Sequence, residues 1–126
     1  MDKNFVMQIA NTIAEQLMGL TPKDVIFSWG VEDMYATEYN NMACLALNVN
    51  GRLHKGEVII AYNEGTDYYD IFLIDTNGEV VKKIEDVDFT QLGEIIDRYI
   101  ERGDNEQEYL DFCENERKKL IQEISN

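Results

Sequence analysis

The middle of the chain, residues 43–84, reads ACLALNVNGRLHKGEVIIAYNEGTDYYDIFLIDTNGEVVKKI, and its pattern is the main indication of the fold class. From Ala43 to Val49, apolar side chains alternate with smaller or polar ones, which is typical of a half-buried strand. Glycine-marked bends follow at residues 50–51, 63–65 and 77–78, and Asn-Gly is the strongest short hairpin signal. Bends this close together leave no room for crossover helices, so the strands are predicted to be antiparallel neighbours in one up-and-down sheet.

The sheet is predicted to have about five strands. Residues 25–29 form a short β-rich run, and alternation in residues 35–39 indicates another strand before a turn at residues 40–41. The strand predicted at residues 68–75 has apolar side chains on both faces. We therefore expect a central strand, covered by helices on one side and partly covered by a long loop or a partner subunit on the other.

Helices are predicted at both ends of the chain. Apolar residues recur at three- and four-residue steps between residues 5 and 17, Gly19 is the expected end of that helix, and Pro22 prevents its continuation. Near the other end, Asp88 and Asn105 each precede a Gln or Glu by three residues, which is typical of a helix start. The last helix has a thin apolar stripe, made by Tyr109, Phe112, Cys113, Leu120 and Ile124 and interrupted by Glu116. That stripe predicts a position on the surface.

The predicted fold class is α+β. An antiparallel β-meander of about five strands is expected to carry an N-terminal helix and two C-terminal helices packed on the sheet. The chain is expected to be a single domain over residues 1–126, because its length and composition fit one globular core.

The charge is lopsided. Residues 64–126 carry 18 acidic and 7 basic residues, and the net charge of the whole chain is −14. Such a field repels nucleic acid and anionic membranes and attracts basic partners, so direct nucleic-acid binding and membrane binding are not expected. The start of the chain lacks the basic residues and unbroken apolar stretch of a secretory signal, and we expect a soluble, cytoplasmic protein.

No motif in the sequence carries catalysis, a metal or a cofactor. His54 is the only histidine, and no nucleophile is marked near it; it is interpreted as a half-exposed strand residue. Cys44 and Cys113 lack zinc-ligand spacing and are expected to be reduced core residues. Asp75 opens a segment with the wrong register for a calcium loop, and a hairpin turn explains it. We expect no catalytic residue, no metal site and no cofactor.

Charge and aromatic residues supply the candidate contact surface. The acidic side chains lie at the start of the last helix, and the aromatic ones cluster before and within the predicted strand at residues 35–39. Aromatic side chains with a polar tip suit a contact surface, although they equally suit one face of a sheet. The candidate partner-binding residues are Glu106, Glu108, Asp111, Glu114, Trp29, Tyr35 and Tyr39.

A further pattern is carried by residues 54–58, 63–69, 78–82, 85–87 and 92–93, within about residues 43–100. In these segments the chain resembles small uncharacterised acidic proteins from gut bacteria that are often associated with phage or conjugative elements. This resemblance implies an α+β domain and assigns no site residues.

Three functions are compatible with these observations. The first is a non-enzymatic interaction or accessory protein that binds a protein with a basic surface, with homo-oligomerisation left open. The second is a DNA-mimic inhibitor of a nucleic-acid-binding enzyme, in which carboxylates would imitate phosphates. The third is a small metal-dependent hydrolase. Interleaved bases such as Arg102 and Lys118 count against a phosphate-like row, and the hydrolase has residues but no spacing.

Overall fold

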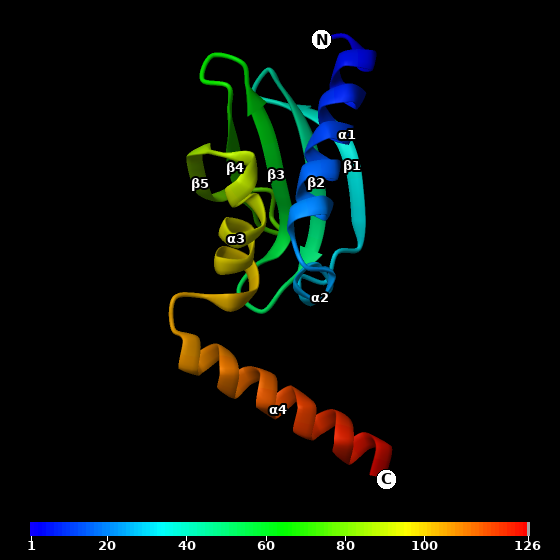
Figure 1. Cartoon of the computed structure of the whole chain (residues 1–126), viewed down its shortest axis with the longest axis vertical. Coiled ribbons are helices and arrows are strands. Elements are labelled where there is room, and N and C mark those ends of the chain that lie inside the picture. Colours follow the sequence, from blue (N-terminus) through cyan, green and yellow to red (C-terminus); the bar gives the residue numbers. More distant parts are fainter. Residues whose placement is uncertain (126) are drawn as a thin grey trace.

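The computed structural model describes residues 1–125 of the chain (Figure 1). Its elements follow one another as α1 (Lys3–Leu20), α2 (Lys23–Ser28), β1 (Asp33–Tyr39), β2 (Met42–Asn50), β3 (Lys55–Asn63), β4 (Tyr68–Ile74), β5 (Val80–Val87), η1 (Phe89–Gln91), α3 (Leu92–Asp97), η2 (Arg98–Arg102) and α4 (Glu106–Ser125). The fold is α+β, as the sequence predicted.

The five strands form one antiparallel sheet in the order β1-β2-β3-β4-β5, which confirms the predicted meander. Its register places Leu47 beside Val58 and Val58 beside Leu73, so that one row of apolar side chains crosses the sheet. β4 pairs on both sides, as its apolar composition predicted, although β3 is the middle strand. The turn predicted at Asn40 and Asn41 is confirmed, because both residues adopt positive φ.

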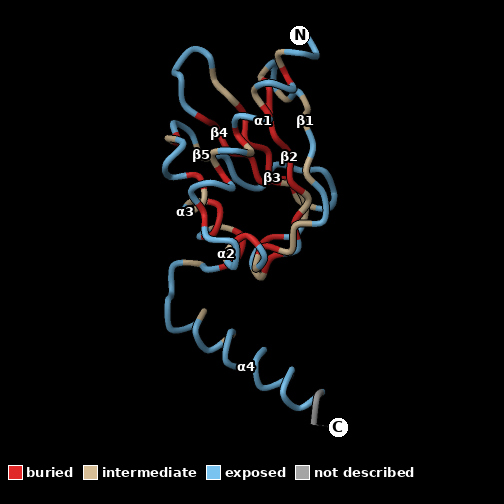
Figure 2. Tube along the Cα trace, turned by 45° about the vertical axis from the view of Figure 1, so that its right-hand side comes forward, coloured by how far each residue is buried: buried red, intermediate tan, exposed pale blue. Residues whose placement is uncertain are grey.

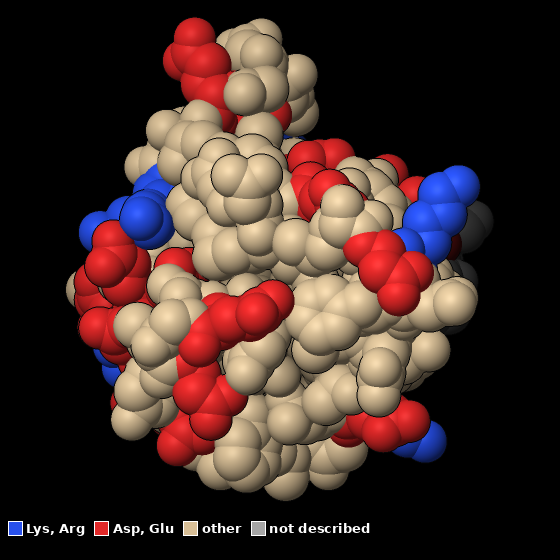
Figure 3. Space-filling model, turned by 90° about the horizontal axis from the view of Figure 1, so that it is seen from above, with Lys and Arg blue, Asp and Glu red and all other residues tan. Residues whose placement is uncertain are grey.

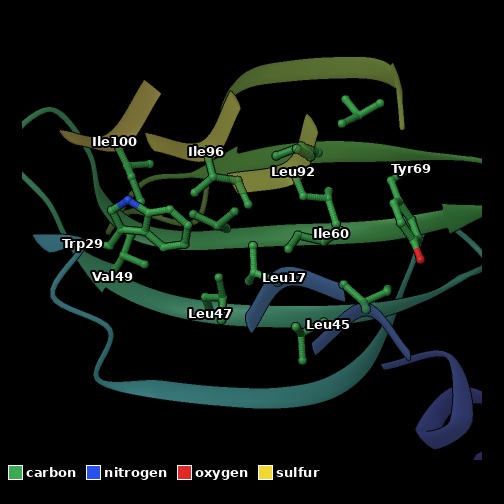
Figure 4. Packing of buried hydrophobic residues seen from close by; sticks show 14 of the residues in the cluster. Leu17, Trp29, Leu45, Leu47, Val49, Ile60, Tyr69, Leu92, Ile96 and Ile100 are labelled. Carbon is green, nitrogen blue, oxygen red and sulfur yellow. The ribbon is translucent and has the colours of Figure 1, made fainter. Parts of the chain in front are cut away.

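One face of the sheet is covered by helices, and α1 and α3 lie across the same side of the strands (Figure 1). Side chains from α1, the strands and the C-terminal helical segments interlock there (Figure 4). The fully buried members include Ile13, Leu17, Trp29, Leu47, Val58, Ile60, Ile71, Leu92, Ile96 and Ile100. A capping box at Asp88 and Gln91 starts the C-terminal helical segment, as predicted.

The opposite face of the sheet is called the open face below, and the side chains buried there come from the strands themselves. Its buried cluster consists of strand residues only: Cys44, Ala46, Ile59, Ala61, Phe72 and Ile74. The residues packed against this cluster, Tyr39 and Met42, also come from strands β1 and β2. No loop residue belongs to this cluster in the described part of the chain, so the long loop predicted to cover this face is wrong. The alternative cover, a partner subunit, stays a prediction.

Residues 25–29 were predicted to form a strand, and this prediction is wrong. They lie in and just after α2, which begins after Pro22, where the Ile26 amide donates to the Pro22 carbonyl at 3.2 Å. A short apolar run does not distinguish a buried strand from a buried helical turn. The Gly19 prediction is also wrong in detail, because α1 continues to Leu20 and its end has no left-handed glycine.

The bend at residues 50–51 is longer than the predicted two-residue turn. β2 ends at Asn50 and β3 begins at Lys55, and the Gly51 amide donates to the His54 carbonyl at 3.0 Å. Gly51 does not adopt positive φ. A Cβ atom there would overlap the carbonyl oxygen of Ile100, so this position requires glycine for close approach to the C-terminal helices.

The last helix, α4, does not lie on the sheet. It extends away from the body of the molecule after Gly103 (Figure 1). The prediction that both C-terminal helices pack on the sheet therefore holds for α3, which contributes Leu92 and Ile96 to the core, and α4 is an arm.

Candidate functional site

The arm, defined as α4, is the most exposed element of the molecule (Figure 2). Its side chains from Glu106 to Glu123 are exposed except for Tyr109 and Phe112, which are half-buried. The Asn105 side chain accepts a hydrogen bond from the Glu108 amide at 3.0 Å, which confirms the predicted cap. Twenty residues make a helix about 30 Å long, so most of the arm lies beyond the body.

Arg52 fastens the start of the arm to the body. Its guanidinium donates to the carbonyl oxygens of Glu101 and Arg102, each at 2.9 Å. The same group lies over the rings of Tyr109 and Phe112, at 5.7 and 5.5 Å from their centroids. A flat cation held by carbonyls and aromatic faces is a strong attachment. It reaches only the first two turns of α4, and the rest of the helix is free of it.

Two carboxylates are buried beneath this attachment. Asp97 accepts a hydrogen bond from the Trp29 indole at 3.0 Å, and Glu101 accepts one from the Arg52 amide at 2.8 Å. Burial raises the pKa of Glu101, while the amide and the charge of Arg52 oppose that shift. These residues were not singled out in the sequence. Their four-residue spacing beside Ile96 and Ile100 was the available signal.

The four predicted acidic residues all lie on the arm and are exposed. Glu106 contacts Arg102 at 3.2 Å, and Glu108 contacts Arg52 at 3.6 Å. Asp111 accepts a hydrogen bond from the Gln107 amide group at 2.9 Å, and Glu114 lies 3.7 Å from Lys118. At 100° per residue these side chains spread around more than half of the helix circumference, so they form a broad surface rather than a line.

The predicted aromatic residues do not join that surface. Trp29 is fully buried beside Val49 and Ile100 (Figure 4), so its predicted role in partner contact is wrong. Tyr35 and Tyr39 lie on β1 and face the open side of the sheet, away from Trp29. Strand alternation explains this separation, because the two tyrosines share one face.

On the open face, the two tyrosines are tied to neighbours. The Tyr35 hydroxyl donates to a Glu57 carboxylate oxygen at 2.6 Å, and that hydrogen bond raises the pKa of Tyr35 to about 12. Tyr39 packs edge-on against Phe72, with ring centroids 4.8 Å apart. This is the alternative in which aromatic side chains cover a sheet face.

Other residues considered in the sequence have structural roles. His54 is buried in the loop between β2 and β3, not half-exposed on a strand, and its Nε2 lies 3.1 Å from the Glu57 carbonyl. Asp75 accepts from the amides of Asn77 and Glu79 within a hairpin, as predicted. Cys44 is buried and free, but Cys113 is exposed on the arm, so its predicted core position is wrong.

Residues 1–125, as far as the structure describes them, contain no group of three or more His, Cys, Asp or Glu side chains placed to hold a metal ion. No helix in the same part of the chain is long and apolar enough to span a membrane.

The apolar surface of the arm is broader than the sequence indicated. Leu110 and Ile121 were not part of the predicted stripe, yet 50% and 55% of their surfaces are exposed. Leu120, which was part of it, is 58% exposed. The predicted stripe member Ile124 lies outside the residues whose side chains the structure describes. The arm therefore exposes both acidic and aliphatic side chains.

Comparison with known proteins adds no assignment: the chain matches no protein-family model, no curated protein and no solved structure. The functional argument therefore depends on the geometry of the arm.

Proposed function

We propose that the protein is a non-enzymatic interaction module that binds a protein with a basic surface through the acidic first half of α4. The observation that carries this proposal is the projection of the arm from the body with Glu106, Glu108, Asp111 and Glu114 all exposed. A helix without packing neighbours along most of its length contributes little to the core. Such a surface is available for contact with another molecule.

The charges on the arm favour exchange of ion pairs with a partner. The contact between Glu106 and Arg102 lies at the surface, and an exposed pair contributes only about 0–1 kcal/mol. A lysine or arginine side chain of a partner can therefore replace it at little cost. Glu108 is exposed too, although its partner Arg52 is largely buried. The net charge of −14 adds long-range attraction, which speeds association with a basic partner and weakens as salt is added.

Acidic groups elsewhere are less suited to this role. On the face seen from above in Figure 3, acidic side chains lie in separate groups among uncharged and basic ones. Separate groups add to long-range attraction but offer no single surface that orients a partner. The arm supports the proposal better because its acidic residues are close in sequence and on one element.

The other two candidate functions lack a specific observation in their favour. A DNA mimic needs a continuous row of carboxylates, whereas Arg117, Lys118 and Lys119 follow Glu114 and Glu116 on the same helix, and Glu114 contacts two of these bases. A metal-dependent hydrolase needs convergent ligands, and the described residues offer no such group. Direct nucleic-acid binding is likewise outside the proposal, and the cytoplasm is the location we propose.

Neutralisation of the arm tests the proposal. The test variant is Glu106→Gln/Glu108→Gln/Asp111→Asn, and the matched control Glu15→Gln/Glu32→Gln/Glu64→Gln removes the same charge from exposed positions on the body. Binding partners are recovered at low and high salt with the native chain and with both variants. Each recovered partner is then purified, and its affinity for the native chain and for both variants is measured by calorimetry.

We expect one basic protein that binds the native chain and the control at low salt and binds the arm variant at least about tenfold more weakly, since close interfacial charges are worth more than about 1.4 kcal/mol. Equal weakening by both variants would show that only net charge matters. Binding that survives high salt and the arm variant would place the interface elsewhere.

A further inference from the structure

A stripe on the outer side of the arm is self-complementary. It consists of Leu110, Glu114, Arg117 and Ile121, at successive steps of four, three and four residues. Such steps keep the four side chains within about 60° of one another around a helix. Tyr109 and Phe112, which contact Arg52, lie outside this stripe, so attachment of the arm to the body leaves the stripe exposed.

The order of the side chains along the stripe makes it complementary to a second, antiparallel copy of itself. From the first residue to the last, the side chains are aliphatic, acidic, basic and aliphatic. The spacing between them is the same in the reverse direction. Leu110 and Ile121 are 50% and 55% exposed, which is unusual for large aliphatic side chains placed in register on one helix face. Glu114 and Arg117 approach each other only to 3.9 Å within the helix, so both retain capacity for a further partner.

We propose that α4 pairs antiparallel with α4 of a second copy of this chain. A twofold axis at the middle of the stripe, between residues 115 and 116, sets Leu110 against Ile121 of the second copy and Glu114 against Arg117 of the second copy. Twofold symmetry repeats each contact, so the pair has aliphatic contacts at both ends and ion pairs in the centre. Leu120, also exposed, borders the same seam.

Charge selects this direction over the parallel one. In a parallel pair, Glu114 would face Glu114 and Arg117 would face Arg117, which places like charges together. In the antiparallel pair, the acidic first half of each helix lies beside the end that carries Arg117, Lys118 and Lys119. The two bodies then lie at opposite ends of the paired helices. This inference does not depend on the basic partner proposed above, although Glu114 belongs to both surfaces. Glu108 and Asp111 lie off the stripe, and Glu106 lies on the same side of the helix, one turn before Leu110.

Charge exchange on the full-length chain tests the pairing. Sedimentation equilibrium over a wide range of concentration is expected to show a reversible monomer–dimer equilibrium for the native protein. Glu114→Arg and Arg117→Glu are each expected to weaken dimerisation by at least about tenfold, because each creates like-charge contacts in the seam. The double variant Glu114→Arg/Arg117→Glu and an equimolar mixture of the two single variants are both expected to recover it.

Cys113 tests the register of the pair. In the antiparallel register, residue 118 of the second copy lies at the axial level of Cys113, so the two Cys113 residues are offset along the helix axis by about 7.5 Å. Their Cα atoms are then too far apart for a disulfide. Mild oxidation is expected to leave the dimer without a covalent link through Cys113.

A native chain that stays monomeric at all concentrations would overturn the proposal. Dimerisation that is unaffected by either single charge variant would place the interface on another surface, and an efficient Cys113 cross-link would show a different register; either result overturns the proposal. Circular dichroism of each variant establishes that α4 remains helical. Dimerisation that is unchanged in Glu106→Gln/Glu108→Gln/Asp111→Asn would separate this result from the basic-partner proposal.

Discussion

Trp29 and Asp97 join α2 to the C-terminal helical segment through a buried hydrogen bond. The indole is fully buried, and its N–H is 3.0 Å from an Asp97 carboxylate oxygen. If a buried carboxylate loses its hydrogen-bond donor, the free-energy cost of removing it from water is no longer offset. The bond therefore fixes how α2 and α3 lie against the sheet as well as adding stability.

Trp29→Phe is expected to lower the free energy of unfolding by about 2–3 kcal/mol, because Asp97 loses its donor and part of the ring volume is lost. Urea unfolding followed by circular dichroism measures this change. Phe27→Leu is the control, since Phe27 is 82% exposed and its replacement is expected to change the free energy by less than about 0.5 kcal/mol. Equal effects of the two substitutions would show that the indole hydrogen bond contributes little.

The two cysteines are expected to differ in reactivity. Burial raises the pKa of the Cys44 thiol to about 12, whereas Cys113 is exposed on the arm. The thiolate is the reactive form, so a thiol reagent at mild pH is expected to modify Cys113 rapidly and Cys44 only after denaturation. Rapid modification of both thiols in the native protein would contradict the buried position of Cys44.

The same shift predicts an alkaline loss of stability. Because the pKa of Cys44 is higher in the folded than in the unfolded chain, its contribution is complete below the unfolded value of 9.0. That contribution is lost as pH rises from there towards about 12. Cys44→Ala is therefore expected to show a smaller fall in the free energy of unfolding over that range than the native chain. The pKa of Tyr35 is also raised to about 12, so Tyr35 lowers the free energy of unfolding at high pH as well. This decrease is present in both the native chain and Cys44→Ala and cancels when the two are compared.

At the scale of elements, most of the body could be predicted from the sequence. The strands alternate with period two and the bends carry Asn and Gly, so strand number, direction and neighbours follow from local rules. The stretch that predicted the later strands ends at residue 84, whereas β5 runs from Val80 to Val87. Those limits depend on packing of the loops, which periodicity does not report.

Two elements could not be predicted correctly. The apolar run at residues 25–29 is too short to reveal its period, and burial of Trp29 among distant residues decides its conformation. The arm has an apolar stripe that looks like a packing face, but the attachment at Arg52 holds only its first turns. Whether the apolar stripe of α4 packs on the body depends on the direction that the chain takes after Gly103. That direction is set by contacts between residues far apart in sequence.

Arg52 controls the attachment of the arm. Arg52→Lys is expected to increase amide exchange across residues 106–112, because lysine cannot bind two carbonyls and stack on two rings at once. Exchange in β3 and β4 is expected to change little, since the core does not depend on this contact. Arg98→Lys is the matched control, because Arg98 is half-exposed and its ion pairs are 3.9 Å long. Unchanged exchange in the Arg52 variant would show that the arm is held by other contacts.

Glycine at position 103 sets the direction in which the arm leaves the body. Gly103 has φ 78° and ψ −173°, a conformation that other residues adopt only with strain. Gly103→Ala is expected to destabilise this conformation by about 1–3 kcal/mol. In contrast, Gly19→Ala lies in a helix with open space around it and is expected to stabilise the protein by about 0.5–1 kcal/mol. Thermal unfolding checks both values: the midpoint temperature is expected to fall for Gly103→Ala and to rise for Gly19→Ala.

For the molecule as a whole, the core and the arm separate cleanly along the chain. Every buried apolar side chain in the described residues lies between Val6 and Ile100. The arm adds half-buried Tyr109 and Phe112 and otherwise exposes its surface. Fold stability and the proposed interactions therefore belong to different parts of the chain.

This separation predicts that a chain ending at residue 104 folds without the arm. Such a chain keeps the sheet, the Trp29–Asp97 bond and the bonds from Arg52 to the Glu101 and Arg102 carbonyls. We expect its free energy of unfolding to fall by only about 1–2 kcal/mol, the value of the partial burial lost at Tyr109 and Phe112. Urea unfolding followed by Trp29 fluorescence measures it, and near-ultraviolet circular dichroism reports whether Trp29 remains fixed. A chain that loses this signal would show that the arm supports the core, and exposure of the arm would then no longer indicate a part reserved for contact with other molecules.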